Sequence, residues 1–286
     1  MVPEPMSDPT RNGVPLLRVR FSAGYASRPD VLRDVALDVL PGEVMGLVGQ
    51  SGSGKSTLAM ALLGLLDRRC NVRGSIRLQG QELIGLSEPN LRSLRGRAMA
   101  LVLQSPLTSL NPALRIQTQL TEAWRAHTSG TRQPAVEKIR AALLSVSLPA
   151  DDEFLRKLPS QMSVGQAQRV LIAMAVLHRP ALLIADEATS ALDVITQSEI
   201  LSLFAKLNRE LGMAILYISH DLASVAEICH RISILHQGEI VECGSREQIF
   251  CNPRHEYTRR LMAALPKLPG LARAATAGGI APPSIQ

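Results

Sequence analysis

Residues 49–56 read GQSGSGKS, directly after the apolar segment EVMGLVG (43–49) and just before the apolar segment LAMALLGLL (58–66). The spacing matches GxxxxGK[ST], in which glycines let the backbone wrap a phosphate so that successive N–H groups and the next helix's N-terminus face the anion. The flanking segments predict the strand and the helix that this motif needs. The stretch therefore predicts a phosphate loop, in which Lys55 would reach the β- and γ-phosphates of a nucleotide and the Ser56 hydroxyl would ligate Mg²⁺.

A second segment, ALLIADE (181–187), is an apolar run that ends in two acids. Ligands of open α/β sheets bind at the carboxyl ends of the strands, which is where both carboxylates would lie. Asp186 would hold Mg²⁺ through water, and Glu187 would orient and deprotonate an attacking water. An acidic strand end is weak evidence alone, but together with a phosphate loop it indicates hydrolysis of a nucleoside triphosphate.

Short, bounded apolar segments predict the core of the fold. Four of them are typical of buried parallel strands, at 43–49, 98–104, 181–187 and 213–220. Three earlier extended segments, at 16–22, 31–43 and 72–80, predict an antiparallel β-edge. We therefore expect an α/β fold of the P-loop nucleotide-hydrolase type, with a mostly parallel sheet and flanking helices.

The sequence between the second and third core strands is mostly helical in pattern. In QPAVEKIRAALLSVSLP (133–149), Val136, Ile139, Leu143 and Val146 recur at helical spacing and predict one buried stripe. We expect an inserted helical subdomain over about 105–178, then a hairpin at 231–244 and a closing helix at 255–266. The expected units are a flexible segment over 1–15, a main domain over 16–265 and a flexible tail over 266–286.

Composition restricts the classes of protein that need to be considered. With 46% apolar and 20% charged residues the chain resembles an ordinary globular protein, and its apolar runs are too short to span a bilayer. The start of the chain lacks the features of a secretory signal, which favours the cytosol. Residues 253–286 hold five basic residues and one acid, so this end carries +4 of the net +6 and a nucleic-acid partner is not expected. The four cysteines have no metal-site spacing.

Further motifs follow in a defined order. Gln104 ends the second core segment, MSVGQAQR (162–169) opens a helix before ALLIADE, SALD (190–193) follows it, and His220 ends the next strand. Over residues 16–265 this order resembles that of the ATPase subunits of ABC transporters: P-loop, glutamine loop, LSGGQ signature, acidic strand, D-loop and histidine switch. Six motifs in one order make the resemblance highly specific.

The resemblance implies roles for individual residues. Tyr25 would stack on adenine, Gln104 would contact Mg²⁺ or water, His220 would contact the γ-phosphate, and Asp193 would help to bridge two subunits. The structural alternatives are a core tyrosine, a strand-end amide, a core histidine and a helix cap, respectively. Glu187, His220 and Gln104 form the expected catalytic set, and Ser56, Gln104 and Asp186 the expected metal ligands. The residues expected to bind ATP are Tyr25, Gly49, Ser51, Gly52, Ser53, Gly54, Lys55, Ser56, Thr57, Ser163, Gly165, Gln166 and Asp193.

The resemblance also implies partners. In this family each ATP lies between the P-loop of one subunit and the signature of another, so the working unit is a dimer of ATPase subunits, either identical or different. Two transmembrane permease subunits and, indirectly, an extracytoplasmic substrate-binding protein complete the importer. The chain would then lie peripherally on the cytoplasmic face of the plasma or inner membrane.

Two stretches point to a subfamily. QSPLTSLNP (104–112) resembles QDPxxSLNP in the ATPases of peptide and nickel importers, although Ser105 stands where Asp is usual. NPRHEYTRRLMAALP (252–266) resembles their C-terminal NPxHxYTxxL segment. No cysteine follows Cys251, so the iron–sulfur cysteine cluster that some members add is not expected. The expected cargo is a peptide or a nickel or other metal chelate.

The signature departs from its usual form, because Met162 and Val164 replace the first and third residues of LSGGQ. Ser163 suits a helix N-cap that presents the first amides to a phosphate on the partner subunit. Val164 puts a Cβ where the usual residue has none, which is either a tolerated change or the cause of a weakened composite site. Ala188, where Pro is usual, is a second departure. Other functions remain possible, namely an ABC ATPase of another transporter, one acting on nucleic acid or ribosomes, or a non-hydrolysing regulator.

Overall fold

The computed structural model describes residues 13–128 and 132–264. The larger of its two sheets has the order β10-β9-β3-β8-β7-β6. Its strands are β3 (Val44–Val48), β6 (Met99–Val102), β7 (Leu182–Asp186), β8 (Ala214–Ser219), β9 (Arg231–His236) and β10 (Glu239–Ser245). All neighbours pair in parallel except β9 and β10, which form an antiparallel hairpin. The four predicted core strands and the predicted hairpin are confirmed.

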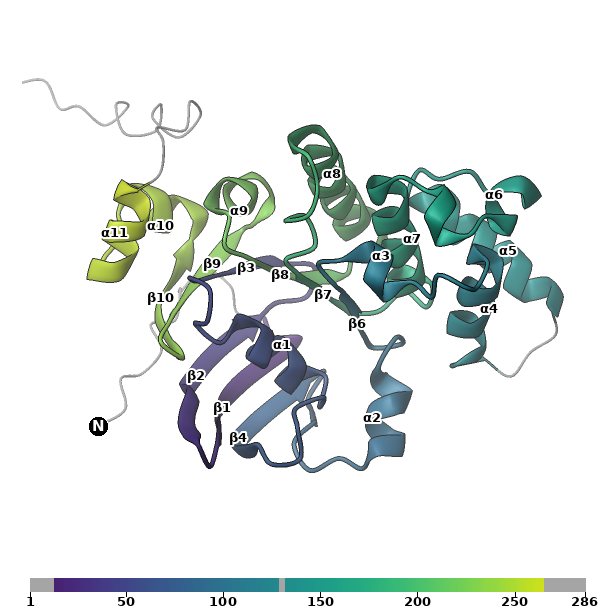
Figure 1. Cartoon of the computed structure of the whole chain (residues 1–286). Coiled ribbons are helices and arrows are strands. Elements are labelled where there is room, and N and C mark those ends of the chain that lie inside the picture. Colours follow the sequence, from purple (N-terminus) through teal and green to yellow (C-terminus); the bar gives the residue numbers. More distant parts are fainter. Residues whose placement is uncertain (1–12, 129–131, 265–286) are drawn as a thin grey trace, which may run out of the picture.

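The smaller sheet is antiparallel and has the order β2-β1-β4-β5. Its strands are β1 (Leu17–Tyr25), β2 (Arg28–Val39), β4 (Asn71–Leu78) and β5 (Gln81–Glu82). The three early extended segments therefore form a sheet of their own, and β10 is the antiparallel edge of the larger sheet. Figure 1 shows α1 (Lys55–Leu62) between the two sheets, with α2 (Glu88–Leu94) beside β4.

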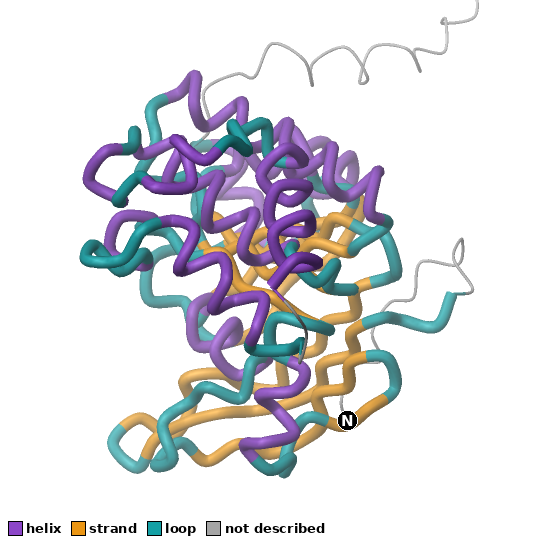
Figure 2. Tube along the Cα trace, turned by 90° about the vertical axis from the view of Figure 1, so that its right-hand side faces the viewer, coloured by secondary structure: helices purple, strands orange, loops and turns teal. Residues whose placement is uncertain are grey.

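Alternating side chains give the larger sheet two buried faces. Leu183 and Ile215 point into one hydrophobic core together with the helices, whereas Ile184 and Leu216 point into a second core shared with α1 and the smaller sheet. Figure 2 shows most helices gathered on one side of the strands of the larger sheet. Because both faces are covered, the strands read as continuous apolar runs.

The helices on the first face come mainly from the segment between β6 and β7. They are α3 (Pro106–Ser109), α4 (Ile116–Arg125), α5 (Arg132–Ser145), α6 (Asp152–Arg156) and α7 (Val164–Val176), with a 3₁₀ turn, η1 (Pro159–Gln161), before α7. In and just after α5, Ile139, Leu143 and Val146 are fully buried as the spacing predicts, and Val136 is half-buried. Later helices are α8 (Val194–Leu211), α9 (Leu222–Ile228), α10 (Arg246–Cys251) and α11 (Glu256–Ala263).

The expected flexible tail, 266–286, lies outside the described residues, as does most of the expected flexible segment 1–15. The predicted closing helix is present as α11, although Pro266 is also outside the described part. Within residues 13–128 and 132–264, no helix is both long enough and apolar enough to cross a membrane. The four cysteines are free, and no cluster of three or more metal-ligating side chains occurs in these same ranges.

Candidate active site

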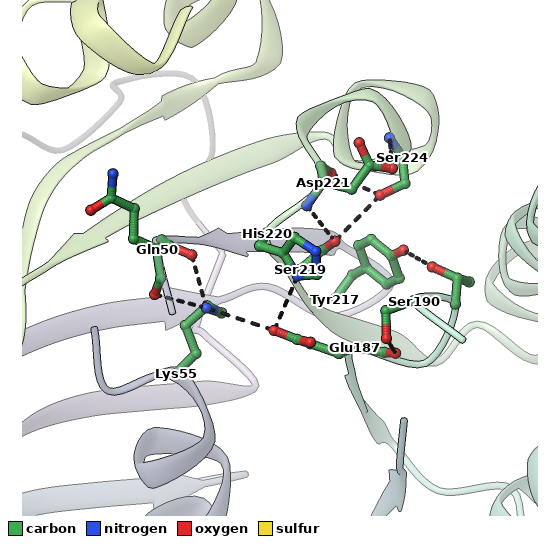
Figure 3. Close-up of polar contacts among 11 residues, drawn as sticks. Gln50, Lys55, Glu187, Ser190, Tyr217, Ser219, His220, Asp221 and Ser224 are labelled. Atoms are coloured by element: carbon green, nitrogen blue, oxygen red, sulfur yellow. Dashed lines mark hydrogen bonds and ion pairs between the residues drawn. The ribbon is translucent and has the colours of Figure 1, made fainter. Parts of the chain in front are cut away.

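Three parallel strands end side by side at the candidate site. Val48 of β3 pairs with Ser219 of β8, and Asp186 of β7 pairs with Ile218. The residues that follow these strand ends are therefore brought to one edge of the sheet, as the carboxyl ends of parallel strands must be. The phosphate loop, Glu187 and His220 meet there (Figure 3).

The phosphate loop has a backbone that only glycine allows at several points. Gly52 and Gly54 have φ angles of 78° and 108°, in the left-handed region, and Gly54 caps the start of α1. A Cβ on Gly54 would lie 2.7 Å from Cδ2 of Leu32, and one on Gly49 would lie 2.3 Å from the carbonyl oxygen of Leu235. The loop is thus pressed against both sheets. Ser51, Gly52 and Ser56 remain exposed on its open side, and Thr57 is half-buried.

Lys55 is held inside this loop. Its side chain is only 5% exposed, and Nζ donates to the carbonyl oxygens of Gly49 (2.8 Å) and Gln50 (3.1 Å). The same ammonium lies 3.8 Å from Oε1 of Glu187 (Figure 3). A buried positive charge is thus held inside the loop, and a glycine-rich loop with such a charge suits phosphate binding.

Glu187 occupies an unusual backbone conformation. Its φ is 49°, a region that residues with a Cβ seldom adopt, and its N–H donates to the carbonyl of Ile218 at 2.9 Å. This turn aims the carboxylate between two partners, because Oε1 lies 3.2 Å from Nδ1 of His220 as well as 3.8 Å from Lys55. Backbone strain of this kind gathers at functional sites. Ala188, the next residue, is buried.

Asp186 is a buried carboxylate with unused hydrogen-bonding capacity. It is 7% exposed, and its Oδ1 has no hydrogen-bond partner in the described chain. Burial raises the pKa of this group, and the charge of Glu187 raises it further, while the Ser56 hydroxyl and Lys55 act in the opposite direction. An unpartnered carboxylate oxygen beside a hydroxyl is a set of hard oxygen donors that suits Mg²⁺.

Gln104 does not end a strand, and that expectation is wrong. β6 ends at Val102, and Gln104 is exposed in a bend two residues later, because Pro106 opens α3 and turns the chain out of the sheet. The bend is held by a residue that the sequence did not single out. Gln168, fully buried in α7, donates from Nε2 to the Leu103 carbonyl at 3.4 Å. Gln168 lies about one helical turn after Gly165, on the same side of the signature helix, and this spacing could have identified it from the sequence.

The signature residues form the start of α7. Ser163 is the N-cap, its hydroxyl accepts from the Gln166 N–H, and the Gln166 side chain accepts from the Ser163 N–H, each at 3.2 Å. This capping box confirms the predicted N-cap. Val164 is 38% exposed, whereas a Cβ on Gly165 would lie 2.7 Å from Cγ2 of Thr196. Within residues 13–128 and 132–264, the signature residues form no hydrogen bond or ion pair with Lys55, Glu187 or His220.

Asp193 caps α8 and contacts Thr196, the residue that lies against Gly165. Its carboxylate accepts from the N–H groups of Ile195 (3.1 Å) and Thr196 (3.0 Å) and from the Thr196 hydroxyl (2.7 Å). The hydrogen bonds from Thr196 lower the pKa of this carboxyl. Asp193 is therefore a helix cap in this chain, and a role between subunits remains a prediction.

Tyr25 ends β1, where the hairpin to β2 begins. The ring is half-buried, and burial together with neighbouring Cys70 raises the pKa of its phenol. The hairpin is the part of the smaller sheet that borders the phosphate loop, since Leu32 of β2 packs on Gly54. Stacking on adenine remains a prediction for this residue.

Comparison with known proteins gives two family matches. Residues 32–190 match the family described as ABC transporter, and residues 241–286 match the family described as oligopeptide/dipeptide transporter, C-terminal region. The glutathione import ATP-binding protein GsiA of Escherichia coli (strain K12) is 42% identical over 245 residues, which are 83% of this chain and 39% of that protein. GsiA of Salmonella typhimurium is 42% identical over 246 residues, covering 84% and 40%. The chain thus spans about two fifths of the length of these relatives.

Solved structures show the same architecture. The ATP-binding cassette MJ0796, a dimer in a post-hydrolysis state bound to ADP and Pi, superposes with a TM-score of 0.69 at 25% identity, covering 80% of this chain and 98% of that one. CbiO1 from Clostridium perfringens, part of the ABC transporter complex cbiONQ, superposes with a TM-score of 0.73 at 25% identity, covering 88% and 96%. The fold predicted from the sequence is confirmed.

Proposed function

Because this chain belongs to the ABC transporter family, we propose that it binds and hydrolyses ATP to drive import of a peptide cargo through a membrane permease. The position of Glu187 carries the proposal. A carboxylate held between Lys55 (3.8 Å) and His220 (3.2 Å), beside a phosphate loop, suits a base that activates water next to a γ-phosphate. Its φ of 49° adds support, because strained backbone is enriched at active sites.

The residues at this edge divide the chemistry between them. Lys55 and the loop amides bind and orient the β- and γ-phosphates. Glu187 accepts a proton from the attacking water, and His220 holds the Glu187 carboxylate in place and contacts the γ-phosphate. Ser56, Asp186 and, from its exposed bend, Gln104 would hold Mg²⁺, which when bound supplies positive charge to the phosphate oxygens. Tyr25 would stack on the adenine.

The second half of each site comes from another cassette in this proposal. Ser163, Gly165 and Gln166 present the amino end of α7, which suits an anion bound by a partner cassette. Exposure of Val164 (38%), Val194 (82%) and Ile195 (75%) on the single chain is consistent with a surface that a partner covers. The partner is a second copy or a related ATPase subunit, as in the dimeric cassette MJ0796.

Exposed apolar side chains also suggest where the chain docks on the permease. Leu103 and Leu107 are 37% and 45% exposed on either side of Gln104, at the boundary between the sheet edge and the helical insertion. We propose that two permease subunits contact this region, so that the chain lies peripherally on the cytoplasmic face of the membrane and meets a substrate-binding protein only indirectly. The match of residues 241–286 to a peptide-transporter region favours peptides over nickel chelates as cargo.

The test is Glu187→Gln, which removes the base and leaves the phosphate contacts. We expect the variant to bind ATP like the wild type, to lose hydrolysis by about 10²- to 10⁴-fold, and to accumulate as an ATP-bound dimer or complex. Glu210→Gln, on an exposed position of α8, is the matched control and should leave both properties unchanged. Near wild-type turnover by Glu187→Gln would show that Glu187 is not the base.

A further inference from the structure

Within the described part of the C-terminal region, residues 241–264, one buried acid joins the turn before α11 to strand β10. Glu242 is 8% exposed, and its carboxylate accepts from the N–H groups of Arg254 (2.9 Å) and His255 (3.0 Å). An irregularity in the β9–β10 pairing falls between Ile240 and Glu242, next to this carboxylate. The turn before α11 is thereby tied to β10 (Figure 1).

This attachment brings Tyr257 of α11 against the end of β9. Its ring stacks on that of His236, with centroids 3.7 Å apart and planes inclined by 22°. The phenol oxygen is buried and has no complete hydrogen bond in the described chain. The polar group that faces it is the backbone amide of Gln50, which lowers the phenol pKa while burial raises it. A side chain from the C-terminal region therefore reaches the phosphate loop.

The end of β9 and the turn that follows it contact the phosphate loop at two points. The loop begins against Leu235, whose carbonyl oxygen leaves no room for a Cβ on Gly49. It is held again at Ser53, whose carbonyl oxygen accepts from the Gly238 N–H at 3.1 Å. His236 lies between these two supports in the sequence. The Tyr257 ring, which stacks on His236, therefore packs against the backbone segment that contacts the phosphate loop.

Gln50 links this support to the reacting groups. Its N–H faces Tyr257, and its carbonyl oxygen accepts from Nζ of Lys55 at 3.1 Å (Figure 3). The Gln50 N–H shares a peptide unit with the Gly49 carbonyl, which also accepts from Nζ of Lys55, at 2.8 Å. Movement of the Gln50 backbone would therefore move both of these contacts of the lysine. Loops held in the binding conformation before the ligand arrives bind more tightly, because less ordering is left to the binding step.

We propose that Tyr257 is a positioning residue for the phosphate loop, and that the C-terminal region thereby sets the affinity of this cassette for nucleotide. The inference rests on the proposed function, in that Lys55 and the loop are taken to bind ATP. Tyr257 acts through the loop and touches no reacting atom. Most of its effect comes from the ring, which packs on His236, since the hydroxyl completes no hydrogen bond.

The experiment measures nucleotide affinity of the full chain and steady-state ATP hydrolysis of the assembled complex. We expect Tyr257→Ala to weaken ATP binding and raise KM by about ten-fold, which corresponds to about 1.4 kcal/mol, with kcat within about two-fold of wild type. Tyr257→Phe keeps the stacked ring and should stay within about two-fold of wild type in both. His236→Ala should resemble Tyr257→Ala.

Leu261→Ala is the control for general loosening of α11, because Leu261 packs on the main hydrophobic core from the same helix. We expect it to lower the melting temperature as Tyr257→Ala does, but to leave KM unchanged. Wild-type affinity in Tyr257→Ala, or an equal rise of KM in Leu261→Ala, would overturn the proposal. Failure of the wild-type chain itself to bind ATP would instead overturn the proposed function.

Discussion

The position that a Cβ would take on Gly165 lies 2.7 Å from Cγ2 of Thr196, so the start of α7 presses against the start of α8. The residue before it, Val164, is 38% exposed. Of the two central positions of the signature, only 165 therefore requires glycine within this chain. The valine at 164 is accommodated by its own subunit, and any cost of its two methyl groups falls on the surface that closes against a partner.

Gly165→Ala is expected to force α7 and α8 apart and to destabilise the chain by about 1–3 kcal/mol, because the added methyl overlaps the Thr196 methyl. Thr196→Ser removes that methyl and keeps the hydroxyl that donates to Asp193 at 2.7 Å. The double variant should therefore regain most of the lost stability. Chemical denaturation of the wild type, both single variants and the double variant measures the coupling, and additive effects would contradict the contact.

Val164→Gly is expected to leave the nucleotide affinity of the isolated subunit unchanged, because the phosphate loop sets it. In the assembled transporter it should raise ATP turnover several-fold, a change of about 1 kcal/mol in the barrier, if the valine limits closure of the dimer. Glycine also loosens the start of a helix by roughly 0.5–1 kcal/mol, which works against this gain. Equal or lower steady-state turnover would mean that valine is simply tolerated.

Asp186→Asn is expected to raise the melting temperature of the nucleotide-free chain at neutral pH. Burial raises the pKa of Asp186 above its usual value of 3.8, because the folded chain favours the protonated carboxyl. The stability gained from the protonated form is fully present below pH 3.8 and is lost as pH rises through the folded-state pKa. The neutral amide avoids this loss. Mg²⁺-ATP should stabilise the wild type more than the variant. Thermal unfolding with and without Mg²⁺-ATP tests both effects, and a lower melting temperature for the nucleotide-free variant would contradict the first.

Glu242→Gln is expected to cost about 1–3 kcal/mol of stability, because the amide nitrogen would face a backbone N–H in a buried place. Burial acts to raise the pKa of Glu242, but its hydrogen bonds outweigh burial and lower it below 4.5. The ionised Glu242 carboxylate thus stabilises the wild-type protein above pH 4.5, and this stability is lost as pH falls through the folded-state pKa.

The Glu242→Gln variant should lose this part of the acid dependence, measured by denaturation at several pH values. Glu239→Gln is the matched control on the same strand, since Glu239 is 49% exposed and pairs with Arg33 at the surface. Equal losses from the two variants would show that the buried carboxylate has no special role.

The sequence was informative wherever a structural element depends on its own residues. The phosphate loop, the four core strands and the Ser163 cap were predicted because glycine conformation, strand hydrophobicity and capping are local properties. The sequence was less informative where the conformation of a residue depends on the segment that follows it or on an adjacent strand. β6 ends before Gln104 because Pro106 turns the chain into α3, and the left-handed φ of Glu187 accompanies a hydrogen bond to Ile218 of the adjacent strand.

By itself the sequence determined which residues are the candidates for the chemistry, since Lys55, Asp186, Glu187 and His220 each follow a pattern that is readable within a few residues. Only the tertiary structure decided how far apart they lie and what supports them. The pairing of β3, β7 and β8 places Glu187 between Lys55 and His220, and the fold of residues 241–264 places Tyr257 beside Gln50. Such contacts join segments distant in sequence, and packing of side chains across the whole core selects them.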